Sequence, residues 1–140
     1  MDRFDYELTA QIILSQGQQA IETPQGGNLQ ISNPFIQLTV PFLKTTQSFS
    51  VSVIIFGIKN DIDTKFQLEL KDETTDNSKI ISEVTGEIPK MNLESISSLN
   101  LNIDFRNVIL ENEGKHSATF LIGGREITKT NFYVVINEVS

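Results

Sequence analysis

The stretch TKFQLELK, residues 64–71, decides the fold class because Phe66, Leu68 and Leu70 alternate with polar residues. Strict alternation puts the apolar residues on one face of an extended strand and the polar residues on the other. The stretch LNLNIDFR, residues 99–106, repeats this pattern. Strands with one buried and one solvated face are typical of antiparallel sheets. We therefore predict an all-β protein.

Further segments have strand-like sequences separated by turn residues at intervals of roughly ten residues. They are residues 4–14, 18–23, 35–40, 48–56, 79–88, 115–122 and 130–139. Residues 18–23 follow Gly17 and are expected to form a hairpin with the first strand. This spacing predicts one domain over residues 1–140, an antiparallel β-sandwich of immunoglobulin-like architecture with about eight or nine strands. At most one short helical turn is expected, near residues 91–98.

The segment 35–40 is flanked by Pro34 and Pro41. A proline has no backbone N–H and cannot donate to a sheet ladder. We therefore predict that this segment is an edge strand or a corner where the chain changes sheet.

The composition describes an ordinary globular chain of 140 residues, with 39% hydrophobic and 21% charged residues. Its net charge of −7 would repel nucleic acid and anionic membranes, so neither is an expected partner. The absence of cysteine excludes disulfides and thiolate chemistry. No signal peptide or membrane span is apparent, so we expect a cytoplasmic protein.

The stretch EGKHSATFLIGGREI, residues 113–127, contains the single histidine, His116. Gly114 suits a hairpin turn, and Gly123 and Gly124 stand between two strand-like runs, as in a two-residue hairpin. A phosphate-binding glycine loop would instead lead into a helix. His116 lies on the same face of the predicted strand as the apolar residues Ala118, Phe120 and Ile122, so it should face the core. The adjacent Ser117 should face the other way. We predict no catalytic residue.

Two loops are rich in oxygen ligands and are the weak candidates for a metal site. One carries Asp61 and Asp63, and the other carries Asp72, Glu73 and Asp76. The strand between them would separate the two loops by roughly 26 Å, so they cannot share an ion. Each alone has too few ligands for an EF-hand site. We therefore favour solvated turns and predict no cofactor.

The aromatic residues are mainly phenylalanines on alternating positions, which predicts that they pack in the core. These positions are Phe49, Phe66, Phe105, Phe120 and Phe132. Phe35 and Phe42 lie beside the prolines and are the two candidates for exposure. If exposed, they would mark a contact patch for a partner.

The C-terminal stretch GKHSATFLIGGREITKTNFYVVI, residues 114–136, resembles the last hairpin of many bacterial β-sandwich modules. Together with FDYELTAQIIL, residues 4–14, it makes the chain similar to uncharacterised bacterial families known only as domains of unknown function. His116 departs from the tyrosine that such hairpins often carry. The resemblance implies a fold and no catalytic residues.

Function has to be argued from a site rather than from a fold. The leading hypothesis is a non-enzymatic interaction or structural module that binds a protein, or a second copy of itself, through a sheet edge near residues 35–42. The alternative is a module that binds a small ligand, a sugar or calcium at its loop ends. An enzyme ranks last, because one histidine and no cysteine leave few routes to acid–base or nucleophilic chemistry.

Overall fold

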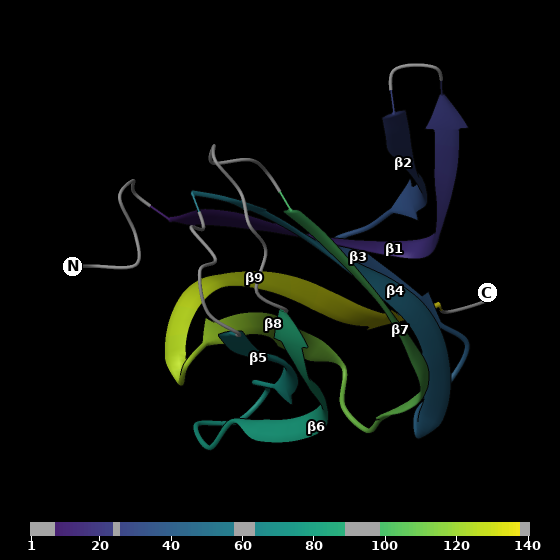
Figure 1. Ribbon diagram of the computed structural model, residues 1–140. Helices are drawn as coiled ribbons and strands as arrows, with labels where there is room; N and C mark the ends of the chain where they lie inside the picture. The colour runs from purple at the N-terminus through teal and green to yellow at the C-terminus, as the bar shows by residue number, and fades with distance from the viewer. Residues whose placement is uncertain (1–7, 24–25, 58–63, 89–98, 138–140) are drawn as a thin grey trace.

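The computed structural model describes residues 8–23, 26–57, 64–88 and 99–137 (Figure 1). These residues form strands and connecting turns, and no helix is present among them. The all-β prediction is confirmed, whereas the helical turn expected near residues 91–98 lies outside the described residues. The strands are β1 (Thr9–Thr23), β2 (Gly26–Pro34), β3 (Gln37–Val40), β4 (Thr45–Phe56), β5 (Thr64–Asp72), β6 (Lys79–Ile88), β7 (Leu99–Leu110), β8 (Gly114–Ile122) and β9 (Arg125–Ile136).

The described strands form two sheets that pack face to face (Figure 1). One has the order β2-β1-β4-β7 and the other the order β3-β9-β8-β5-β6. Strands β4 and β7 pair as B and E do in an immunoglobulin sandwich, and β8 lies between β5 and β9 as F lies between C and G. The β-sandwich prediction is therefore confirmed.

The pairing departs from the expected antiparallel sandwich at one place, because β3 runs parallel to β9. The chain leaves the first sheet at the end of β2 and enters the second sheet at β3. The strand that follows this change of sheet pairs with the last strand of the chain rather than with a sequence neighbour. Two strands this far apart in sequence need no tight turn, so a parallel pairing is possible.

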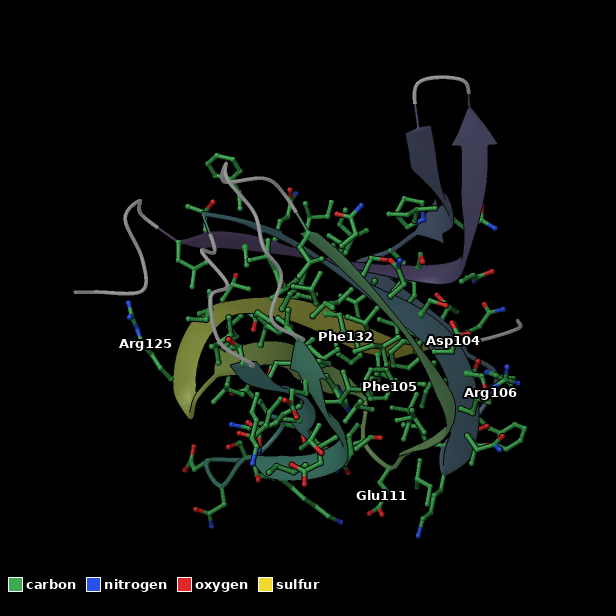
Figure 2. The ribbon with its side chains drawn as sticks, viewed as in Figure 1. Asp104, Phe105, Arg106, Glu111, Arg125 and Phe132 are labelled. Atoms are coloured by element: carbon green, nitrogen blue, oxygen red, sulfur yellow. The ribbon has the colours of Figure 1, made fainter. Side chains whose placement is uncertain are left out.

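The core lies between the two sheets and is built from the alternating apolar positions. All five phenylalanines predicted for the core are buried, and Phe105 and Phe132 point between the sheets in Figure 2. The ring centroid of Phe49 lies 6.2 Å from that of Phe105 and 6.0 Å from that of Phe132, which joins the two sheets. Burial of each such side chain contributes about 1.5–3 kcal/mol to stability.

The hairpin expected between residues 4–14 and 18–23 is wrong. Strand β1 runs through Gly17 without a turn, and Gly17 lies opposite Ser32 of β2. The hairpin partner is therefore β2, and the antiparallel pairing runs as far as Thr23 opposite Gly26. A single glycine weakens a strand but does not by itself end it.

The two glycine features of residues 113–127 have different outcomes. Gly123 and Gly124 have φ angles of 58° and 81° and connect β8 to β9, which confirms the predicted hairpin. Gly114 has a φ of 128° but does not form a hairpin, because β7 and β8 belong to different sheets. It instead lies at the corner where the chain crosses the sandwich.

Candidate functional site

Strand β3 is the outermost strand of its sheet, as the flanking prolines predict. The N–H groups of Tyr133 and Asn137 donate to the carbonyls of Ile36 and Val40, both at 2.8 Å. Successive residues of a strand direct their backbone N–H and C=O groups to opposite sides. Between Ile36 and Val40, these groups therefore point alternately toward β9 and away from it. Within the described residues, no strand pairs with the outer side of β3.

The structure separates the two phenylalanines that were predicted to be exposed. Phe35 is half-buried and packs edge-on against Phe49, with ring centroids 5.8 Å apart. Phe42 is 61% exposed and lies just beyond the end of β3. Only Phe42 therefore has an accessible ring of the kind that a contact patch needs.

Phe42 lines a surface hollow of about 400 Å³, the Phe42 hollow, formed by Phe42, Lys44, Thr45, Thr46 and Ile109. Ile109 is 48% exposed and lies opposite Thr46 on the neighbouring strand. Two large exposed apolar side chains thus come together from segments that are far apart in sequence. Glu111, labelled in Figure 2, follows β7 at this end, and its Oε1 is 3.7 Å from Lys44 Nζ and 3.8 Å from Lys79 Nζ.

Ile109 was missed in the sequence because β7 changes its phase. The pairing of β4 with β7 is irregular between Gln47 and Phe49, and Asn107 has a φ of 54°. A bulge of this kind adds one residue and shifts the alternation that follows. Val108 and Leu110 face the core, and Ile109 faces solvent. The run Val-Ile-Leu alone does not reveal which member is exposed.

His116 is fully buried, as its parity predicts, and it forms a polar corner with residues of the β5–β6 turn. Its Nδ1 lies 2.9 Å from the carbonyl oxygen of Gly114, so Nδ1 carries the proton and donates. Its Nε2 lies 3.8 Å from Asp72 Oδ2, which is too far for a hydrogen bond, and has no hydrogen-bond partner among the described residues. The ring centroid is 5.4 Å from that of Phe132. Immunoglobulin sandwiches place a tyrosine at this corner.

Asp72 organises the same corner by accepting three hydrogen bonds. Thr74 donates from its N–H at 2.9 Å and from its hydroxyl at 2.6 Å, and Asn112 Nδ2 donates at 2.8 Å. Burial raises the pKa of the Asp72 carboxyl, but these hydrogen bonds and the attraction of His116 outweigh it, and the pKa is lowered. Asp72 therefore fixes the turn as an ionised group.

A second polar cluster lies on the outer face of the five-stranded sheet. Glu73 Oε1 accepts a hydrogen bond from Lys129 Nζ at 3.1 Å, and this ion pair connects the residue that follows β5 to β9, with β8 between the two strands. Ser117 and Thr119 of β8 are buried beside it. The nearby Ser117 hydroxyl, and next Lys129, lower the pKa of Glu73 against the opposing effect of burial. Ser117 and His116 thus face opposite sides of the sheet, as predicted.

Only one of the two weak metal candidates lies within the described part of the chain. Asp61 and Asp63 lie outside the described residues. Asp72 is engaged by Thr74 and Asn112, while Asp76 is exposed. No group of three or more His, Asp or Glu side chains with metal-binding geometry occurs among the described residues. A membrane-crossing helix is likewise not found there.

Residues 18–135 match the protein family described as a family of unknown function (DUF6941). The chain belongs to this family. The match covers β1 from residue 18 onward, all of β2 to β8 and β9 up to residue 135, so it includes the Phe42 hollow and the His116 corner. Membership in DUF6941 confirms the predicted resemblance to a domain of unknown function. No curated protein matches the sequence.

Solved structures similar to this DUF6941 chain include β-glucosidase from Listeria innocua. One structure of that enzyme is 11% identical over 96% of this chain and 17% of the enzyme chain, with a TM-score of 0.48. The complex of the enzyme with isofagomine has a TM-score of 0.47, and it too is 11% identical over 96% of this chain and 17% of the enzyme chain. The chain thus spans 17% of the enzyme's length, and a likeness at this TM-score carries no argument about function.

Proposed function

We propose that this DUF6941 protein is a non-enzymatic module that binds a protein partner through the Phe42 hollow. The observation that carries the proposal is the meeting of Phe42 and Ile109, both exposed, in one hollow. Large apolar side chains scattered singly over a surface need no explanation, but two that share a hollow are a typical contact site.

The hollow has the anatomy of a small binding site for an apolar side chain. An aromatic ring and an isoleucine supply the apolar centre. Lys44 adds a charge to the lining, and it pairs with Glu111, which also pairs with Lys79. Interfaces typically combine an apolar centre with a polar rim, and aromatic residues near the centre dominate the binding energy. We expect a partner side chain to insert between Phe42 and Ile109.

The test compares two phenylalanines on the same scaffold. Phe42→Ser removes the ring of the hollow, whereas Phe56→Ser removes a ring that is 50% exposed at the far end of β4. Tagged wild-type protein and both variants are used as baits in lysate of the source organism, and bound proteins are quantified by mass spectrometry. A hot-spot loss of about 2 kcal/mol or more would weaken capture by roughly thirtyfold.

The proposal requires a protein that wild type and Phe56→Ser both capture and Phe42→Ser does not. Equal capture by all three baits would place the contact elsewhere. A comparison of their circular dichroism and melting temperatures checks that the variants are folded, because exposed positions tolerate such changes.

A second candidate function rests on a polar recess on the outer face of the four-stranded sheet. This recess of about 280 Å³ is lined by Gln16, Ser48, Phe49, Ser50, Asp104, Phe105 and Arg106. Ser50 Oγ donates to Asp104 Oδ1 at 2.7 Å. Asp104 and Arg106 lie on β7 at the right of Figure 2.

The carboxylate, guanidinium, amide and hydroxyl groups of this recess suit a ligand that both donates and accepts, such as a sugar. A screen of monosaccharides by thermal shift tests this function, because a ligand that binds only the folded state raises the melting temperature. A shift that disappears in Asp104→Asn would support a sugar site. No shift with any sugar at millimolar concentration would leave the Phe42 hollow as the sole candidate.

A further inference from the structure

Strands β1 and β2 form an arm that stands away from the sandwich (Figure 1). Residues 9–15 of β1 pair with β4, and residues 17–23 continue past the sheet and pair with β2 alone. The pairing of this outer half runs from Gly17 opposite Ser32 to Thr23 opposite Gly26. A two-stranded ribbon without further partners is only marginally stable in water. The arm is therefore an element that another strand would stabilise.

The outer side of β2 is an open sheet edge. Strand β2 is the first in the order of its sheet, and no other described strand pairs with it on that side. In an antiparallel ladder, alternate residues direct both their N–H and their C=O groups to the same side. Such a row of outward backbone groups is a template for another strand.

This edge lacks the features that usually prevent pairing. Natural edge strands often carry prolines, lysines or other charged residues. Residues 26–33 of β2 contain none of these, and the one proline of the strand, Pro34, stands at its last position. By contrast, β6 carries Lys79, Glu83 and Glu87, and β7, the other edge of the four-stranded sheet, carries Asp104 and Arg106. Strand β3 stands between two prolines. Among the outermost strands of the two sheets, β2 is thus the one suited to bind another strand.

We propose that β2 pairs antiparallel with β2 of a second copy of this chain, about a two-fold axis. This would join two four-stranded sheets into one continuous sheet. A two-fold interface uses the same strand on both copies and is therefore self-complementary. Main-chain hydrogen bonds supply the contact without needing a special side-chain pattern.

The charge distribution favours a second copy as the occupant. The chain carries a net charge of −7, so most of its surface repels another copy. Between residues 16 and 33, however, the only charged residue is Glu22. The arm is consequently the place where two copies approach with least repulsion. A basic partner would instead be drawn to the acidic sandwich.

Sedimentation velocity of the full chain over a range of concentrations tests the proposal. Wild type is expected to move from 15.7 kDa toward twice that mass as the concentration rises. The double variant Asn28→Lys and Gln30→Lys places like charges across the paired strands. It should raise the dissociation constant by roughly tenfold or more. Thr85→Lys adds a lysine to β6, the opposite edge of the other sheet, and should leave the dissociation constant unchanged.

Hydrogen exchange locates the contact independently of any variant. The amides of residues 26–33 should become more protected at high concentration than at low concentration, while those of β6 should not change. A mass that stays monomeric at every concentration overturns the proposal. So does a dimer that the β2 lysines do not weaken. The inference is independent of the Phe42 hollow, because Phe42→Ser should leave the dimer intact.

Discussion

Asp72 at the end of β5 lies directly opposite His116 at the start of β8, and its Oδ2 is 3.8 Å from His116 Nε2. The pair occupies the corner where the chain passes from β7 of one sheet to β8 of the other. Asp72 is held there by Thr74 and Asn112, and His116 by Phe132 and the Gly114 carbonyl. The histidine is thus built into a structural corner, and the carboxylate connects two turns that are 40 residues apart.

Asp72→Asn should destabilise the protein by about 1–3 kcal/mol. The substitution replaces one carboxylate oxygen, an acceptor, with an NH₂ group, which only donates. This NH₂ group would face a hydrogen-bond donor of either Thr74 or Asn112, and one hydrogen bond would be lost. Urea unfolding followed by circular dichroism measures the change. Asp76→Asn is the matched control, since Asp76 is exposed in the same turn and should change stability by less than about 0.5 kcal/mol. Equal effects of the two substitutions would contradict the role assigned to Asp72.

The lowered pKa of Asp72 also gives a sign to the pH dependence of stability. The folded state binds the Asp72 proton more weakly than the unfolded state, in which the pKa is near the usual 3.8. The ionised carboxylate therefore contributes its stability above that value, and the contribution is lost as the pH falls through the lower folded-state pKa. The difference in unfolding free energy between wild type and Asp72→Asn should shrink below about pH 4. A difference that stays constant from neutral to acidic pH would show that the charge is not involved.

Local patterns predicted the fold well because the strands of this protein alternate so regularly. The period-two stretches identified β5 and the first part of β7, and the parity of His116 predicted its burial. The exposure of Ile109 was not predictable, because it depends on a bulge formed by two strands together. The hairpin partner of β1 was missed for a related reason, since strand continuity through Gly17 depends on pairing with Ser32.

The candidate site was predicted only in part. The prolines indicated the edge position of β3, and Phe42 was recognised as a candidate for exposure. Lys44, Thr45 and Thr46 closely follow Phe42 along the chain, whereas Ile109 comes from β7, and no spacing in the sequence indicates that β7 meets the end of β3. Long-range neighbours of this kind follow from strand order, which one sequence does not specify.

Gly86→Ala should destabilise the sandwich by about 1–3 kcal/mol, the usual cost of overpacking. A Cβ at this position would lie 2.7 Å from two ring atoms of Phe66. That ring cannot retreat easily, because it also packs against Phe120 with centroids 6.1 Å apart. Thermal unfolding compares Gly86→Ala with Thr85→Ala, a change at the exposed neighbouring position on the same strand. A loss no larger than that of Thr85→Ala would mean that the Phe66 ring has room to move.

Phe35 and Phe42 should respond oppositely to the same substitution, although both lie beside a proline. Phe35→Ala removes a ring that packs edge-on against Phe49 and contacts the core, so we expect a loss of about 2–4 kcal/mol. Phe42→Ala removes a ring that is mostly exposed, and the free energy of unfolding should change by less than about 0.5 kcal/mol. Urea unfolding of the two variants separates a stabilising ring from one that is available to a partner. If Phe42→Ala were as destabilising as Phe35→Ala, the ring would have a folding role that accounts for its position without any partner.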